Sequence, residues 1–335
     1  MFVTFVSRKK WLLAAIIAAG IMPASTKAAE TLRWKFKAGD AADYVMTRNL
    51  DGKFDFNGQE MDFNFGLVID LSWDVKSVAD DGTAEVHQKI VRVQLDTASP
   101  IGGQLKYDST QGEPTANPAW GMFGPMVKAL VGAEISMKVS PNGEVKDITL
   151  PESLVKALSP PGGGRRRMNF GGMSEDGIKE IVQRSFTRLP DAPVEGEENW
   201  EQQFASTFGN AGKQVTDVKF SLAGVEDKEG KKVAKIVATT EMSFEPNADQ
   251  TTEFELEITE QEGNWTALFD VEKGRTLEST SKQKTTMEII AGDREFKQQI
   301  DETIAIKEGK SPEAKPEEKK PEEKAEEKEK KESSN

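Results

Sequence analysis

Residues 61–74, MDFNFGLVIDLSWD, decide the fold class of this chain. Every second residue from Phe63 to Trp73 is large and apolar, and the residues between them are mostly polar or small. Side chains of a β-strand alternate between two faces, so this stretch would have one buried face and one solvated face. A helix turns by about 100° per residue and would scatter the same apolar side chains around its axis. The pattern therefore predicts a long β-strand.

The same alternation recurs along the chain, most clearly where Phe254, Leu256 and Ile258 are separated by glutamates. Similar patterns predict strands at residues 43–49, 83–95, 134–148, 214–223, 233–244, 265–271, 276–290 and 296–306. Turn dipeptides lie among them: Asn57-Gly58, Asp81-Gly82, Asn142-Gly143, Glu229-Gly230, Gly263-Asn264 and Lys273-Gly274. Such dipeptides tolerate the positive φ of tight hairpins, so consecutive strands should pair antiparallel.

Three helices are expected to interrupt the sheet, at residues 117–131, 151–158 and 174–186. The first is apolar almost all round, which is typical of a helix packed inside a protein. We therefore predict a mainly β protein of the α+β class. A large curved antiparallel sheet would carry a helical insertion, at about residues 117–187, packed on its concave face. From the sequence, one curved sheet and two domains are both possible.

The first 28 residues have the order of an export signal. Basic residues at positions 8–10 precede an apolar run from Trp11 to Met22, and Pro23 and small residues lead to Ala28. As a helix the apolar run would reach about 18 Å, against a bilayer core of about 30 Å. We expect residues 1–28 to be a cleaved signal peptide without a stable membrane anchor. The protein would then be periplasmic or extracellular.

Charge and composition limit the possible partners and the domain organisation of the protein. The formal net charge is -13, which argues against nucleic acid as a partner. The absence of cysteine excludes disulfides and a cysteine-linked lipid anchor. Residues 308–335 are mostly Lys, Glu, Pro and Ala, with too little apolar surface to fold. We predict a β-rich globular domain at residues 29–307 and a disordered tail at residues 308–335.

Few residues suggest catalysis. His87 is the one histidine, so the usual multi-histidine zinc site and a Ser-His-Asp triad both lack members. The many carboxylates leave a paired-acid hydrolase as an alternative. The run from Gly162 to Arg167 lacks the Gly-Lys-Ser/Thr ending of a phosphate loop and is predicted to be an exposed loop. We predict a non-enzymatic protein with no cofactor and no metal site.

The apolar helix at residues 117–131 suggests a binding function. If the sheet curls and this helix caps its mouth, the interior is either filled core or a lipid-sized cavity. Methionine adapts to variable apolar ligands. The candidate binding residues for an acyl chain or other apolar ligand are Trp120, Phe123 and Met126 of the helix, facing Phe63, Phe65 and Trp73 of the strand.

Two motifs carry a resemblance to known proteins. Gly39 followed by Tyr44, a "G....Y" opening, and the later run of Leu189-Pro190, Pro193-Val194 and Trp200 resemble a family of uncharacterised exported bacterial proteins. At fold level the chain is similar to the lipoprotein-carrier superfamily, whose members curl a sheet around helices to hold acyl chains. That resemblance implies a fold and an apolar ligand, and no catalytic residues.

These observations lead to two functional hypotheses. The first is an exported non-enzymatic protein that binds a lipid or other apolar ligand between the curved sheet and the apolar helix. The alternative is a cell-envelope interaction or scaffold module that acts through its surface and the charged tail, with an envelope protein or polymer as partner.

Overall fold

A computed structural model describes residues 29–56, 58–100, 102–114, 117–158, 174–194, 198–208, 212–228, 230–246, 254–291 and 294–311. The predicted signal peptide at residues 1–28 and the run from Gly162 to Arg167 lie outside the described residues. So does the predicted tail, apart from residues 308–311.

The described chain forms strands and a few short helices. The strands are β1 (Ala41–Phe56), β2 (Gln59–Val78), β3 (Ala84–Ser99), β4 (Gly103–Asp108), β5 (Glu134–Val139), β6 (Val145–Thr149), β7 (Asn199–Phe208), β8 (Gly212–Lys228), β9 (Lys231–Pro246), β10 (Phe254–Asp270), β11 (Arg275–Ala291) and β12 (Arg294–Glu308). The helices are α1 (Pro118–Leu130), α2 (Glu152–Leu158) and α3 (Glu175–Arg184).

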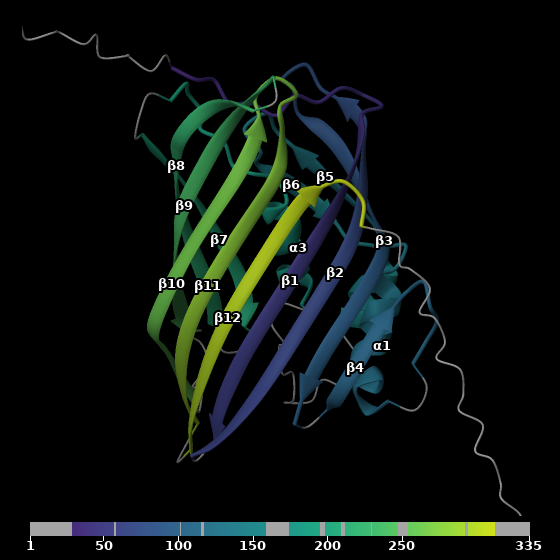
Figure 1. The fold of residues 1–335 in the computed structure, drawn as a ribbon, viewed down its shortest axis with the longest axis vertical. Coiled ribbons are helices and arrows are strands. Elements are labelled where there is room, and N and C mark those ends of the chain that lie inside the picture. The colour runs from purple at the N-terminus through teal and green to yellow at the C-terminus, as the bar shows by residue number, and fades with distance from the viewer. Residues whose placement is uncertain are drawn as a thin grey trace, which may run out of the picture.

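All the strands belong to one curved antiparallel sheet. Its order is β6-β5-β3-β2-β1-β12-β11-β10-β9-β8-β7, with β4 paired to β3. The first and last strands of the chain meet in the middle of this order, because β1 pairs with β12 from Tyr44 opposite Glu308 to Phe56 opposite Phe296. Figure 1 shows β12 lying beside β1 at the front of the sheet. The choice between one sheet and two domains is thereby resolved in favour of one sheet.

One face of the sheet, here called the inner face, carries the core. It bears Met46, Ile69 and Val93, which are buried neighbours on β1, β2 and β3. Core residues of α3 such as Val182 pack into the same cluster, and the sheet curves around this helix in Figure 1. The predicted fold class, a curved antiparallel sheet with helices on its concave face, is confirmed.

Helix α1 starts as the sequence predicts and lies beside β4 and β3. The side chain of Asn117 accepts a hydrogen bond from the backbone N–H of Ala119 at 2.9 Å, and Pro118 occupies the first turn, where its missing N–H costs nothing. Val127 and Leu130 are buried in the core. Among the described helices, none has the length and apolarity needed to cross a membrane.

Two local predictions are wrong. Gly263-Asn264 is not a turn but lies inside β10, which joins the predicted strands at residues 252–258 and 265–271. A Cβ atom on Gly263 would lie 1.7 Å from Oγ1 of Thr240 and 2.1 Å from Oε1 of Gln283, so this glycine allows two side chains to cross the strand. The predicted strand at residues 134–148 is the hairpin of β5 and β6, with Gly143 in its turn at a φ of 78°.

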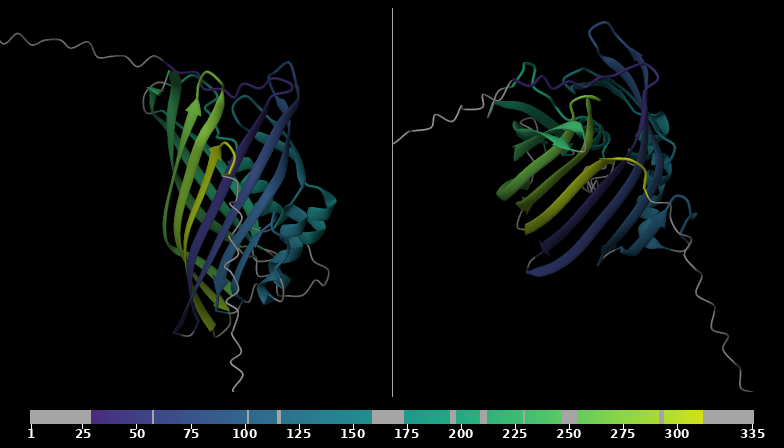
Figure 2. Two further views of the ribbon diagram at one scale, coloured as in Figure 1. Left: turned by 45° about the vertical axis from the view of Figure 1, so that its right-hand side comes forward. Right: turned by 45° about the horizontal axis from the view of Figure 1, so that its top comes forward.

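The two ends of the sheet differ. Strands β1, β9 and β11 end, and strands β2, β10 and β12 begin, at one end of the sheet, here called the hairpin end, at the bottom of Figure 1. The residues that precede β1 run across the other end, as the purple trace at the top of both views in Figure 2 shows. We call that other end the strap end.

Candidate functional site

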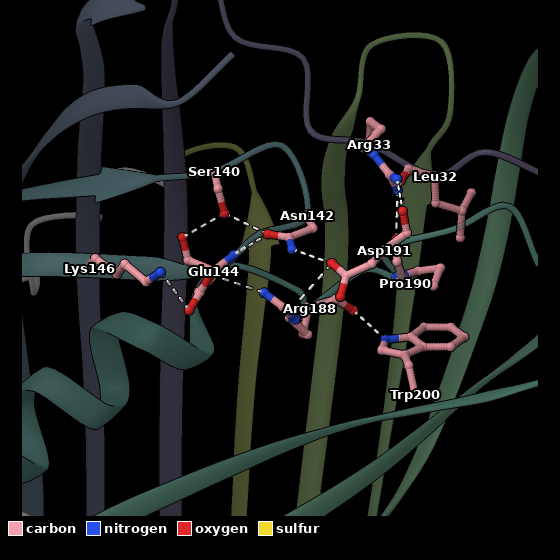
Figure 3. Close-up of polar contacts among 10 residues, drawn as sticks. All are labelled: Leu32, Arg33, Ser140, Asn142, Glu144, Lys146, Arg188, Pro190, Asp191 and Trp200. Atoms are coloured by element: carbon pink, nitrogen blue, oxygen red, sulfur yellow. Dashed lines mark hydrogen bonds and ion pairs between the residues drawn. The ribbon is translucent and has the colours of Figure 1, made fainter. Parts of the chain in front are cut away.

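The strap end is held by residues 187–194, here called the strap, and by the segment that precedes β1. Glu30 and Val194 form an isolated antiparallel bridge. The side chain of Trp34 donates from Nε1 to the carbonyl oxygen of Thr187 at 3.0 Å, and Arg33 donates to the carbonyl oxygen of Pro190 at 2.6 Å. The strap and the N-terminal segment, about 150 residues apart in sequence, are therefore bonded directly to each other (Figure 3).

The strap also joins elements from opposite ends of the strand order. The backbone N–H of Leu189 donates to the carbonyl oxygen of Asn142, in the turn between β5 and β6, at 2.8 Å. On the other side, Nε1 of Trp200 in β7 donates to the carbonyl oxygen of Arg188 at 2.9 Å. Figure 3 shows this network with Asp191 at its centre. The motif residues that carried the family resemblance thus hold the open sheet together, and their polar groups are used within the protein.

The six predicted binding residues occupy three separate environments. The ring of Phe123 contacts that of Phe65 with centroids 6.0 Å apart, Met126 is buried, and Trp120 packs on Tyr107 at 4.6 Å. At these residues the helix and the sheet are in contact, without the gap that the hypothesis placed between them.

The other two predicted residues lie elsewhere. Trp73 is buried in the core, where its ring stacks with Tyr44 at 6.0 Å and contacts Phe186 at 6.3 Å. Phe63 lies nearer the hairpin end, and its ring covers Gly52, where a Cβ atom would come within 2.2 Å of it. The six residues therefore do not line one cavity within the described ranges.

A second group of apolar side chains lies on the inner face near the hairpin end. The strand registers place them on the face that carries Met46, because they pair across β2, β1, β12, β11 and β10. We call this group the apolar belt: Phe54, Met61, Leu256, Ile258, Met287, Ile289 and Phe296. All seven are partly exposed, and none belongs to the core cluster or to the partly buried residues packed on it.

The outer face at the same level is charged. Residues that alternate with the belt include Lys53, Glu60 and Glu257, all exposed. Lys297 and Glu288 form an ion pair at 3.5 Å there. This division is the ordinary one for a sheet with an apolar inside and a solvated outside. The unusual feature is that the inner face stays apolar at the level of the belt, although the belt residues lie outside the core.

The sheet loosens beside the belt. The ladder between β9 and β10 runs only from Asn264 opposite Thr239 to Asp270 opposite Val233, whereas β10 pairs with β11 along its whole length. Beyond that ladder the side chain of Gln261 bonds to the backbone of Met242, accepting from its N–H at 2.6 Å and donating to its carbonyl oxygen at 2.9 Å. One side chain thus replaces the backbone pairing where the two strands separate.

A polar stripe lies between the core and the belt on the inner face. We define it as Arg48, Thr240, Gln283 and Glu302. Arg48 is 6% exposed and donates from Nε to Oε1 of Glu302 at 2.6 Å, with Nη2 2.5 Å from the same oxygen. Thr240 donates to Oε1 of Gln283 at 2.6 Å. Among the described residues Nη1 of Arg48 is buried without a hydrogen-bond partner.

A hollow of about 940 Å³ crosses six neighbouring strands near the hairpin end. Each strand contributes three successive residues to its lining, and for β3 the third of these is Pro100, which directly follows the strand. Its described charged lining residues are Asp51, Asp62, Glu260, Glu262, Asp301, Lys53 and Lys284. Phe63 and Ile300 are the large apolar residues of this lining. The strand registers place Gly52, Phe63, Gln261, Thr285 and Ile300 of this lining on the inner face, and the charged residues that alternate with them on the outer face. The hollow therefore lies on the inner face, between the polar stripe and the apolar belt.

His87, considered above for catalysis, and the ion pair of Arg92 and Asp108 have ordinary structural contacts. Nδ1 of His87 lies 2.6 Å from a carboxylate oxygen of Glu134, on the neighbouring strand. Arg92 and Asp108 pair β3 with β4 through Nε and Oδ1 at 3.1 Å, and the guanidinium holds the pKa of Asp108 well below its usual range. In the part of the chain that the structure describes, no group of three or more His, Asp or Glu side chains is placed to hold a metal ion.

The sequence contained a partial signal for the belt. The sequence predicts Leu256 and Ile258 on one face of a strand, and Met287 and Ile289 lie in another predicted strand. Their common position became visible only through the register, which sets Met287 opposite Ile258 and Ile289 opposite Leu256.

Comparisons with solved structures give distant likenesses. A lipovitellin structure, whose title concerns lipid-protein interactions, has 12% identity and a TM-score of 0.45, and the match covers 84% of this chain and 26% of that chain. The chain thus spans about a quarter of the lipovitellin chain. DynF, from the dynemicin biosynthesis pathway of Micromonospora chersina, has 8% identity and a TM-score of 0.21, with 91% and 98% covered. An outer membrane channel from Pseudomonas putida F1 has 8% identity and a TM-score of 0.24, with 82% and 97% covered. At these scores the likenesses carry no information about a ligand.

Comparison with protein sequences is more definite. A search of the curated proteins returned no match. A family model, DUF6263, described as a family of unknown function, matches residues 81–303. This range includes the strap, the nine strands from β3 to β11 and most of β12. The predicted membership in an uncharacterised family is confirmed: because the match covers most of its length, the chain belongs to the DUF6263 family.

Proposed function

We propose that this protein is a non-enzymatic binding protein for an apolar ligand, which it holds against the apolar belt. The observation that carries the proposal is that the belt's seven side chains are partly exposed on the inner face and lie outside the core. A contiguous exposed apolar surface on a protein commonly marks a binding site. The binding site differs from the one predicted from sequence, because Trp120, Phe123 and Met126 already pack against the protein.

The surroundings of the belt support this proposal. The separation of β9 from β10 beyond Asn264 leaves the sheet less tightly paired beside Ile258 and Leu256, which favours entry of a ligand from that side. Met61 and Met287 supply flexible side chains that adapt to different apolar shapes. Export of the protein, expected from residues 1–28, is part of the same proposal, and N-terminal sequencing of the protein from its host tests it.

Adjacent isoleucines on β11 provide a matched test. Ile289 belongs to the belt, whereas Ile290 points to the outer face and is 46% exposed. The Ile289→Asn variant should weaken binding of the uncharged dye Nile red about fivefold, since losing one partly buried isoleucine contact costs about 1 kcal/mol. The Ile290→Asn variant introduces the same side chain one residue away and should bind as the wild type does.

The controls are the thermal unfolding midpoints of both variants, which should stay close to that of the wild type. Equal affinity of the two variants for the dye would contradict the proposal. Mass spectrometry of ligand recovered after incubation should show it chemically unchanged, as expected of a non-enzymatic protein. Recovery of a cleaved ligand would favour the hydrolase alternative.

A further inference from the structure

We infer that the ligand is an amphiphile with an uncharged, hydrogen-bonding head group, such as the hydroxyls of a monoacylglycerol, bound at the polar stripe. This inference rests on the proposed function, because it assigns the head group of a ligand whose chain lies on the belt. The inference names the chemical class of the ligand's head group, which the apolar belt does not determine because it contacts only the chain.

The position of the stripe suits a head group. Glu302 and Phe296 lie on the same face of β12, six residues apart. At about 3.3 Å per residue, the stripe and the far edge of the belt are separated by about 20 Å. A long-chain amphiphile lying along the strands would therefore place its head at the stripe and its chain over the belt.

The stripe has hydrogen-bonding capacity left over. Within the described part of the chain, both contacts from Arg48 end on Oε1 of Glu302, so the other carboxylate oxygen is left to accept. Nε2 of Gln283 makes only long contacts, at 3.4 and 3.5 Å, and is available as a donor. Nη1 of Arg48, among the described residues, is buried without a hydrogen-bond partner. A hydroxyl both donates and accepts, so it can use Glu302 and Gln283 together.

Charge excludes the common alternatives. Arg48 and Glu302 neutralise each other, so the stripe offers no net charge to an ionic head. A fatty-acid carboxylate would meet the free oxygen of Glu302. An ammonium head would lie beside the buried guanidinium of Arg48. Because the charges of Arg48 and Glu302 are already paired with each other, neither ion would find an unpaired opposite charge at the stripe, whereas a hydroxyl needs none.

Ligands with one chain and different heads test the inference. Monomyristin, myristate and tetradecyltrimethylammonium would each compete with Nile red bound to the full chain. Monomyristin should displace the dye at a concentration at least about tenfold lower than either ion, a difference measurable from the competition curves. Equal or tighter binding of myristate or of the ammonium compound would overturn the inference while leaving the proposed function intact. Failure of both the dye and all three amphiphiles to bind would instead overturn the proposed function.

A pair of neighbouring variants locates the effect. Glu302→Gln removes the carboxylate that opposes an anionic head and keeps an oxygen for Arg48, so the preference for monomyristin over myristate should shrink several-fold. Asp301→Asn makes the same change in charge on the next residue, whose side chain lies on the outer face. It should leave the preference unchanged. An equal effect of both variants would show a general effect of net charge and overturn the assignment to the stripe. If Glu302→Gln does not fold, the competition of the three amphiphiles with Nile red on the wild-type protein still tests the inference.

Discussion

Replacing Gly143 with alanine should test whether the strap end is closed as tightly as its contacts indicate. Gly143 has a φ of 78°. A Cβ atom there would lie 2.3 Å from the carbonyl oxygen of Thr187 and 2.8 Å from Nε1 of Trp34. These two atoms form the hydrogen bond that joins the strap to the N-terminal segment. The substitution therefore forces apart one of the contacts that hold this end together.

The magnitude follows from separate contributions. An alanine in the left-handed region costs about 1–2 kcal/mol. Disturbing the bond between Trp34 and Thr187 adds about 1 kcal/mol, and overpacking of a buried position adds about 1–3 kcal/mol. Gly132 is a matched control, because it also has a φ of 78° and a Cβ atom there would meet nothing within 4 Å. Gly132→Ala should therefore be destabilised only by the cost of placing an alanine in the left-handed region.

Urea unfolding followed by tryptophan fluorescence measures the comparison. The free energy of unfolding should fall by about 2–4 kcal/mol more in Gly143→Ala than in Gly132→Ala. Any gain from restricting the unfolded chain is common to both variants and cancels in this difference. Two variants that agree within about 0.5 kcal/mol would refute the argument that the strap is packed directly against this turn.

Three further measurements address polar contacts. Trp34→Phe keeps an aromatic ring but removes the donor to Thr187, and should lower the free energy of unfolding by about 1–2 kcal/mol in the same urea assay. The pKa of Asp108 is lowered by Arg92 from the usual 3.8, so this pair stabilises the fold above that pH and the contribution disappears as pH falls through the lower folded-state pKa. Asp108→Asn should therefore be less stable than the wild type near neutral pH, and the two unfolding midpoints should converge in acid. Burial raises the pKa values of Tyr44 and Tyr107, the two tyrosines of the chain, so ultraviolet titration of the folded protein should show both tyrosinates only above pH 10.0. Tyrosinate appearing near that pH before unfolding would contradict their burial.

Local pattern was sufficient for the type of most elements. The alternation at residues 61–74 lies within β2, and the helix predicted at residues 174–186 contains α3, which Ser174 caps through the N–H of Gly177. The local pattern was insufficient at glycines, because a glycine can lie either in a turn or inside a strand. Gly143 and Gly263 both look like turn residues, but the first lies in a hairpin and the second in a strand interior. The two glycines differ in their tertiary surroundings, because the side chains of Thr240 and Gln283 cross the strand at Gly263. The local sequence does not show these neighbours.

The candidate site shows the same limit. Phe63 and Phe65 were correctly placed on one face, yet Phe65 packs on Phe123 while Phe63 lies over Gly52. A period of two identifies the face of a strand. It does not say how far along the strand the core extends, because that depends on which helix or segment covers each level.

By itself, the sequence determined the composition, the acidic charge and the alternation that makes this chain a mainly β protein. These properties depend on residues close together in the chain, so they can be recognised without knowing the fold. Only the tertiary structure decided that β1 pairs with β12, that Tyr44 donates to the carbonyl oxygen of Thr276 across 232 residues, and that the strap joins the two sides of the sheet. It also separated the apolar belt from the core. The physical reason is that strand register is set by the sum of many pairings between adjacent strands, which for the belt are β2, β1, β12, β11 and β10, and no single segment contains that information.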